Sequence, residues 1–151
     1  MSARIRILHV MPDTAPGCCP EAMHAAQLAR ALSRFYELDV LCPMLGRQGH
    51  VQQFHGARLL RVPLPPERDE ALEAFARAVE RQLADGIYDA VHVRTALEGE
   101  VALRLGQQAG SEVVFEPGCH GGLVRWMDPA RRAAVERELE ERAHLVLVHG
   151  G

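Results

Sequence analysis

The sequence predicts an α/β fold in which a doubly wound parallel sheet of about six strands carries helices on both faces. Short apolar runs rich in valine, isoleucine and leucine recur along the chain, as expected of strands that are buried on both sides. Segments whose apolar residues repeat at helical spacing lie between these runs. The regular alternation of the two patterns favours parallel strands that are joined by helical crossovers.

Local patterns justify each element of the first half. The apolar run RIRILHV, at 4–10, predicts the first strand. The segment 21–34 predicts a helix, because Pro20 suits the first helical position and Glu21 complements the helix dipole. The next two strands are expected at 38–43 and 57–63, with a glycine-containing loop between them.

The elements of the second half follow in the same way. PLPPERDE interrupts the apolar pattern and introduces a helix at 68–84, and a shorter helix is expected at 98–108. The last helix is capped by Asp128, has Pro129 at its first position and runs to 142. The last three strands are expected at 89–94, 111–117 and 143–149.

The bulk composition limits the class of protein. A chain of 151 residues is long enough for one domain with its own core, and 48% hydrophobic and 25% charged residues are typical of a globular protein. The net charge of −3 excludes a broad basic surface, so we expect no nucleic-acid partner, while peripheral membrane association stays open. No apolar run reaches the ~20 residues of a membrane span, and the N-terminus lacks a signal-peptide pattern, so a cytoplasmic location is expected.

The four cysteines are expected to be free thiols that bind no metal. Cys18 and Cys19 are adjacent, and neither they nor Cys42 and Cys119 form a CxxC pair. Cys18, Cys19, Cys119 and His120 could converge if the first and fifth strands lie close together, and thiolates with an imidazole suit zinc. Adjacent residues rarely ligate the same ion, however, so the spacing argues against such a site.

The candidate site follows from the expected topology. Ligands of a doubly wound sheet bind beyond the carboxyl ends of its strands, near the switch in strand order. The loops at 11–20, 94–98 and 117–127 should therefore form the site. Their candidate residues for catalysis or substrate binding are Gly17, Cys18, Arg94, Glu98, Glu116, Gly118, His120 and Arg125.

Several of these positions have a structural alternative. The loop PGCCPE has neither GxGxxG nor GxxxxGK[ST], so it either binds phosphate at the start of the following helix or is a plain connection. Glu116 could orient a sugar hydroxyl or act as a base, or it is a solvated strand end. Arg94 is a candidate for binding an anion or for an ion pair with Glu98. His9 and His92 lie inside strands and are more simply interpreted as core histidines.

The order of these pieces resembles a known family. RILHVMPD…PEAMHAAQLARALSRFYELDVLCP resembles the opening of the family 4 retaining glycosyltransferases of the GT-B fold, which has an apolar strand, a glycine-containing loop and a helix ending in LARAL. YDAVHVRTALEGEVAL resembles that family's YDVVH strand with its following helix. SEVVFEPGCHGG and ELEERAHLVLVHG resemble its fifth strand and its E…ADLVL segment. The resemblance covers nearly the whole chain.

The resemblance implies that residues 1–151 form a single Rossmann-like domain, the N-terminal and acceptor-side half of a two-domain enzyme. The missing C-terminal domain would hold most of the nucleotide-sugar site, so we expect this chain to be truncated and inactive alone. The implied reaction moves a sugar from a nucleotide-sugar donor to a saccharide, lipid-linked or small-molecule acceptor with retention of configuration, and it needs no cofactor. The alternatives are a stand-alone α/β domain that binds a small anion, and part of a GT-B-fold nucleotide-sugar epimerase.

The resemblance also assigns residues. In the family, a Gly-Gly pair in the first loop lies near the donor diphosphate; this chain retains Gly17 and has Cys18 in place of the second glycine. Many members carry a histidine at the end of the fifth strand, where this chain has Glu116, as a subgroup does, with His120 four residues later. Either Glu116 or His120 is expected to be the catalytic residue. The other expected substrate contacts are Arg94, Glu98, Gly118 and Arg125.

Overall fold

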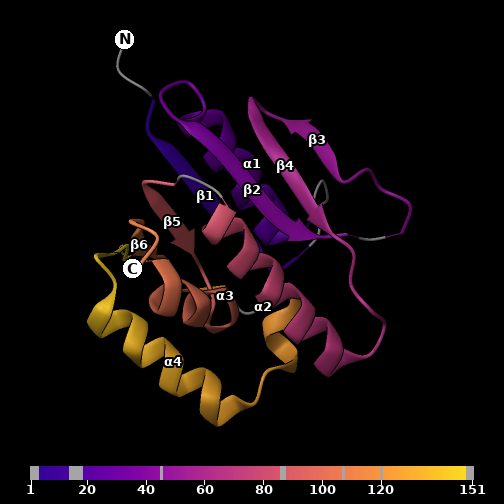
Figure 1. The fold of residues 1–151 in the computed structure, drawn as a ribbon, viewed down its shortest axis with the longest axis vertical. Helices are drawn as coiled ribbons and strands as arrows, with labels where there is room; N and C mark the ends of the chain where they lie inside the picture. The colour runs from indigo at the N-terminus through magenta and orange to yellow at the C-terminus, as the bar shows by residue number, and fades with distance from the viewer. Residues whose placement is uncertain are drawn as a thin grey trace.

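The computed structural model of the protein describes residues 4–13, 19–44, 46–85, 88–106, 108–119 and 121–148. Seven strands of this part form one sheet in the order β3-β4-β2-β1-β5-β6-β7 (Figure 1). Neighbouring strands are parallel except for β3 and β4, which are antiparallel. The strands are β1 (Arg6–Val10), β2 (Glu37–Pro43), β3 (Val51–Phe54), β4 (Ala57–Val62), β5 (Ala90–Val93), β6 (Glu112–Phe115) and β7 (Leu145–Val146). The predicted α/β class with a doubly wound sheet is confirmed.

The helices divide unequally between the two faces of the sheet. Figure 1 shows α2 crossing in front of the sheet with α3 and α4 below it, whereas α1 lies behind the strands. This division follows from chain direction, because crossovers between parallel strands are right-handed and the strand order grows in opposite directions from β1. The helices are α1 (Pro20–Leu32), α2 (Arg68–Asp85), α3 (Ala96–Val101) and α4 (Pro129–Arg142), with a π-helical turn η1 (Ala102–Gly106) and a 3₁₀ helix η2 (Gly122–Trp126).

Two apolar cores hold these layers together. On one face, the side chains of α2, with Phe75 fully buried, pack with those of α3, η2 and α4 against β1, β5 and β6. On the other face, α1 presents Ala22, Ala25 and Ala29 to β2, β3 and β4. Small side chains on α1 let that helix lie close to the sheet, and its N-terminus then lies at the carboxyl ends of the strands.

The strand that the sequence did not predict is β3. Residues 51–54 lie in the expected glycine-containing loop, yet they form a hairpin with β4 in which Phe54 pairs with Ala57. His55 and Gly56 make the turn with φ of 51° and 89°, the left-handed pair of a two-residue hairpin. Three of the four residues of β3 are exposed and two are glutamines, so the apolar pattern that identifies a buried strand is missing.

Other elements differ from expectation at their ends. The helix expected at 98–108 begins at Ala96 and changes to π-helical hydrogen bonding from Ala102. The strand expected at 143–149 is paired only at Leu145 and Val146. Part of the loop that follows β6 forms the 3₁₀ helix η2.

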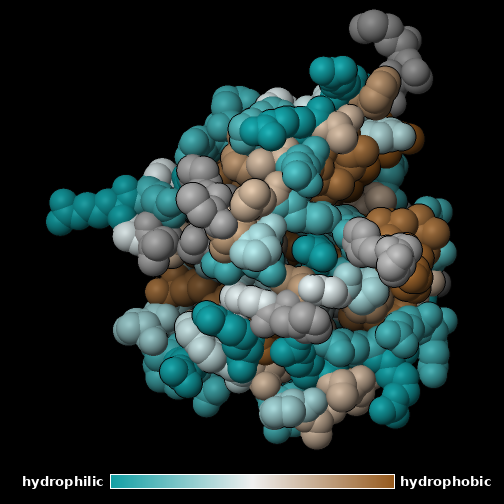
Figure 2. Space-filling view, turned by 180° about the vertical axis from the view of Figure 1, so that it is seen from behind, coloured by the Kyte–Doolittle hydropathy of each residue, from teal (hydrophilic) through white to brown (hydrophobic). Residues whose placement is uncertain are grey.

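Among the described residues, the core under α1 includes side chains of β2, β3 and β4 but none of β6 or β7. Viewed from that side, apolar side chains gather at the edge of the molecule where the chain ends (Figure 2). The exposed apolar residues at this end are Leu145, Leu147 and Val148. Within the described ranges, no helix combines the length and the apolar character needed to cross a bilayer.

Candidate functional site

The strand order changes direction between β1 and β5. From β1 the chain moves to β2 and β4 on one side, and it then returns to add β5, β6 and β7 on the other side. Ligands of such sheets bind in the crevice outside the carboxyl ends of the strands at this switch. The ends of β1, β5 and β6 and the start of α1 are therefore the place to look for a site.

A group of five polar side chains lies at this position, and we call it the switch-point cluster. It comprises His9 of β1, His24 of α1, His92 of β5, and Arg94 and Glu116, which follow β5 and β6. His9 and His92 are cross-strand partners on the neighbouring strands β1 and β5. Glu116 continues the ladder beyond β6, since its N–H donates to the carbonyl of Val93 at 2.9 Å.

The pleat of the sheet turns these side chains to the side of α1. Successive residues of a strand point to opposite faces. Leu8 and Val10 belong to the core under α2, and so do Val91 and Val93. His9 and His92 therefore face the other way, as does Glu116 after the core residue Phe115.

Short contacts join the members of the cluster. Nδ1 of His9 lies 2.7 Å from Nδ1 of His92, and the two rings stack with centroids 4.8 Å apart. Nε2 of His24 lies 2.9 Å from Oε2 of Glu116. Nε2 of His92 lies 2.8 Å from Oε1 of the same carboxylate, without the alignment of an ideal hydrogen bond. Nη2 of Arg94 lies 3.9 Å from Oε2 of Glu116, which places one cation beside the carboxylate.

Burial and neighbouring charges act on the histidines. The pKa of His9 is well below its ordinary value because the ring is buried and because His92, His24 and Arg94 disfavour a further positive charge. The pKa of His24 is also lowered, by burial and by Arg94, while Glu116 opposes this shift. Both rings are therefore neutral at neutral pH. Among the described atoms, Nε2 of His9, Nδ1 of His24 and Nε of Arg94 are buried without a hydrogen-bond partner.

The loops after β1 and β6 meet above the cluster. The N–H of Leu123 donates to the carbonyl of Pro12 at 2.9 Å. Gly122 lies at the same contact, and a Cβ there would come within 2.1 Å of that carbonyl oxygen. Gly118, one of the predicted substrate contacts, lies beside Arg94. A Cβ on Gly118 would be 3.8 Å from Nη2 of Arg94. Arg125 is exposed on η2 and donates from Nε to the carbonyl of Gly122 at 3.0 Å.

Glu98 has its hydrogen-bonding capacity taken up by the start of α3. Its carboxylate is fully buried and accepts from the backbone N–H of Arg94 at 3.0 Å and that of Thr95 at 2.9 Å. The hydroxyl of Thr95 donates to its second oxygen. Burial nonetheless raises the pKa of this carboxyl. Because these contacts are internal to the helix start, we leave Glu98 out of the substrate contacts proposed below.

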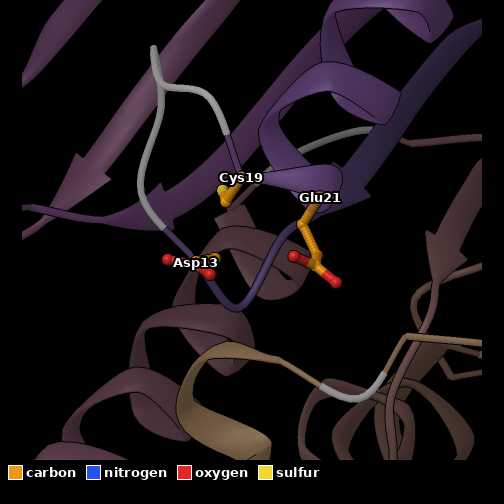
Figure 3. Close-up of side chains that lie close together, drawn as sticks. All are labelled: Asp13, Cys19 and Glu21. Carbon is orange, nitrogen blue, oxygen red and sulfur yellow. The ribbon is translucent and has the colours of Figure 1, made fainter.

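A second cluster lies beside the first, at the start of α1. Figure 3 shows Asp13, Cys19 and Glu21 around the loop after β1, and one ligand atom from each lies within 4.8 Å of the others. Burial raises the pKa of Cys19, and it raises that of Cys119 to about 12. The thiol of Cys119 donates to Oε1 of Glu21 at 3.3 Å. That the thiols bind no metal stays a prediction.

The structure brings some predicted residues together and adds others. Glu116, Arg94 and Gly118 lie together at the switch point, while Gly17, Cys18 and His120 lie outside the described residues. His24 was not predicted, and His9 and His92 were interpreted as core histidines. Both are indeed buried, and their rings also contact each other. Each is the second-last residue of its strand, and β1 and β5 are parallel neighbours, so the two rings lie side by side.

Comparison with known proteins identifies a family. A sequence model described as the glycosyl transferase 4-like domain matches residues 22–149. This range includes all but the first two residues of α1 and every later strand, and it contains four of the five residues of the switch-point cluster. None of the curated proteins compared with the chain matches it.

Solved structures with the same fold come from a cyanobacterial enzyme. Sucrose-phosphate synthase from Thermosynechococcus elongatus is 20% identical, with a TM-score of 0.76 over 97% of this chain and 43% of that chain. A second structure of that enzyme, also titled as coming from T. elongatus, is 19% identical, with a TM-score of 0.68 over 96% of this chain and 76% of that chain. At these identities the likeness shows the fold. The chain thus spans less than half the length of the first of these structures.

Proposed function

Because this chain belongs to the glycosyl transferase 4-like family, we propose that it is the acceptor-side half of a GT-B glycosyltransferase. The reaction moves a sugar from a nucleotide-sugar donor to an acceptor, with retention of configuration at the anomeric carbon. The second half, a C-terminal domain, holds most of the donor. The observation that carries the proposal is the switch-point cluster, which places a buried carboxylate where the fold binds its ligands.

The chemistry of sugar transfer suits a carboxylate at this position. Breaking the bond at the anomeric carbon gives a transition state with positive, oxocarbenium-like charge on the sugar ring. A fixed negative charge that faces the ring stabilises this state without reorganisation. Glu116 supplies that charge, and His120 is the other candidate for the catalytic residue. Arg94 and Gly118 lie within reach of the same space and form the wall that receives the acceptor and the transferred sugar.

The neutral histidines favour substrates that donate hydrogen bonds. A bare imidazole nitrogen accepts a hydrogen bond, as a carboxylate does, and both suit the hydroxyls of a saccharide. Arg94 is the one cation of the switch-point cluster, so a phosphate of the substrate would have a single positively charged side chain to bind there. The donor diphosphate is therefore assigned to the first loop, at the start of α1, and to the second domain.

Both walls of the cleft are needed for activity in this proposal. Stabilisation of the departing diphosphate requires donors from the second domain, and closure of the two halves excludes water. This chain alone is expected to bind substrate weakly and to transfer no sugar.

The test is a transfer assay with the protein that the full gene encodes. Nucleotide-sugars that differ in base and sugar are supplied with saccharide and lipid-linked acceptors, and NMR of the product gives its anomeric configuration. We expect a glycosylated acceptor with the configuration of the donor. Inversion would contradict retention, isomerisation of the nucleotide-sugar without an acceptor would indicate an epimerase, and binding without turnover would indicate an anion-binding domain.

A further inference from the structure

The switch-point cluster contains a continuous chain of contacts that the proposed transfer does not itself require. It runs from His9 through His92 to the carboxylate of Glu116 and on to His24. One imidazole nitrogen lies against each carboxylate oxygen. The chain begins at a fully buried ring and ends at the side chain of His24, which is 25% exposed.

One arrangement of protons satisfies this chain. An ionised carboxylate only accepts, so Nε2 of His24 and Nε2 of His92 each carry a proton. In a neutral His92, Nδ1 is then bare, and the proton between the two Nδ1 atoms belongs to His9. The alternative, a doubly protonated His92, would leave His9 with a buried Nε2–H that no described atom accepts. Buried N–H groups without an acceptor are rare, so the neutral arrangement is preferred.

Charge balance supports the same arrangement. With three neutral rings, the carboxylate of Glu116 is the negative charge of the cluster and Arg94, at 3.9 Å, is the positive one. A fourth ring proton would add a second positive charge to a buried group. The lowered pKa values of His9 and His24 have this cause.

We propose that His24 and His92 are positioning residues that hold the carboxylate of Glu116 ionised and in one orientation at the end of β6. His9 fixes the tautomer of His92 because its Nδ1–H donates to Nδ1 of His92. The inference rests on the proposed function and adds to it the groups through which Glu116 is oriented. Nε2 of His24 on α1 is hydrogen-bonded to one oxygen of the carboxylate, and Nε2 of His92 on β5 lies 2.8 Å from the other oxygen, so two elements restrain the orientation of Glu116.

A spectroscopic experiment tests the chain independently of activity. Nitrogen NMR of the full-length protein, labelled with ¹⁵N-histidine, reports which ring nitrogen is protonated. We expect the ring proton on Nε2 for His24 and His92 and on Nδ1 for His9. Glu116→Gln should shift the His24 signals, and His50→Gln, at an exposed position, should leave the three rings unchanged. A proton on Nδ1 of His24, or a doubly protonated His92, would overturn the proposal.

A kinetic experiment tests the positioning role. His24→Ala and His92→Ala in the full-length enzyme should lower kcat at least about tenfold while KM changes by less than about threefold, because the carboxylate acts in the transition state. His24→Gln and His92→Gln should recover part of kcat, because an amide N–H can still donate to the carboxylate. His50→Ala is the matched control and should match the unmodified enzyme. Unchanged kcat, or glutamine variants no better than alanine variants, would contradict the role.

The outcomes separate this inference from the proposed function. If the unmodified enzyme transfers sugar and the histidine variants keep its kcat, the inference is wrong and the function stands. If the unmodified enzyme transfers no sugar, the proposed function is wrong, and the positioning role is wrong with it. Should His92→Ala fail to fold because it opens a cavity, the variants of the partly exposed His24 decide the matter.

Discussion

Glycine at position 122 is required by the way in which two loops meet. Gly122 has φ of +71°, and a Cβ there would lie 2.1 Å from the carbonyl oxygen of Pro12. The neighbouring hydrogen bond, from the N–H of Leu123 to the same oxygen, ties the loop after β6 to the loop after β1. The backbone of the site therefore depends on the absence of one side chain.

This dependence predicts a large loss of stability in Gly122→Ala. The positive φ costs roughly 1–2 kcal/mol, and the clash with backbone should raise the loss above ~2 kcal/mol. Gly110→Ala is the matched control, because Gly110 also has positive φ but nothing lies within 4 Å of its Cβ position. Urea unfolding measures both variants, and equal losses would contradict the close approach of the two loops.

The histidines of the switch-point cluster predict a loss of stability in acid. His9 and His24 have lowered pKa values in the folded protein, so the unfolded chain binds protons at a higher pH than the folded protein does. Their contribution to stability is present above about pH 6.5 and is lost as pH falls below that value. His92, Arg94 and Glu116 are the other charged or titratable groups of the cluster.

A comparison of variants isolates this effect from other acid-sensitive groups. The free energy of unfolding is measured at pH 7.5 and at pH 5.5 for the unmodified protein and for His24→Gln, which keeps an N–H donor beside Glu116 but does not titrate. The unmodified protein should lose more stability between these pH values than the variant does. An equal or smaller loss would show that His24 is not held neutral.

Single residues of the site were only partly predictable. Glu116, Arg94 and Gly118 follow strands, and the rule that ligands bind at strand ends was enough to select them. His24 lies on a helix among apolar residues, where nothing in its local pattern separates it from a surface histidine. The contacts of His9 and His92 depend on strand order, which local sequence does not contain. Glu98 was predicted to bind substrate from its place after a strand, whereas its carboxylate caps the helix that follows.

At the scale of elements, the start of α3 depends on that buried carboxylate. Glu98 accepts from two backbone N–H groups and from the hydroxyl of Thr95. The first N–H groups of a helix have no partner within the helix, so a side chain that accepts from them stabilises the helix start. The same interaction fixes the turn that carries Arg94 into the switch-point cluster.

Glu98→Ala should therefore cost about 2 kcal/mol or more, because it leaves buried donors without acceptors. Glu138→Ala on α4 is the control: Glu138 is exposed and pairs with Arg142 at helical spacing, so its loss should stay within about 0.5 kcal/mol. Chemical unfolding of the two variants decides the matter. If Glu98→Ala were as mild as the control, the carboxylate would have no capping role.

Elements were predictable where one periodicity dominates. Strands β1, β2, β4, β5 and β6 are apolar runs, and α1, α2 and α4 carry start signals such as Pro20 and Asp128, so their positions were confirmed within a few residues. β3 was missed because it is an exposed edge strand with two glutamines, and its pairing depends on the turn at His55 and Gly56. The π-helical turn after α3 has no local signal that we recognise.

At the scale of the whole molecule, the sheet explains why a site forms here. Crossovers in opposite directions from β1 place α1 on one face and α2, α3 and α4 on the other. The strand order changes direction between β1 and β5, and the polar side chains of the switch-point cluster lie at this point. The apolar residues exposed around β7 lie on the side where the sheet has no covering helix within the described residues (Figure 2).

The central claim is that sugar transfer takes place against the carboxylate of Glu116. The most direct test measures transfer by the full-length protein, with Glu116→Ala beside the exposed-site control His50→Ala. Glu116→Ala removes the negative charge that stabilises the transition state, so it should lower kcat by roughly 10²-fold or more. The control should keep the activity of the unmodified protein. Transfer by Glu116→Ala at the unmodified rate would contradict the claim.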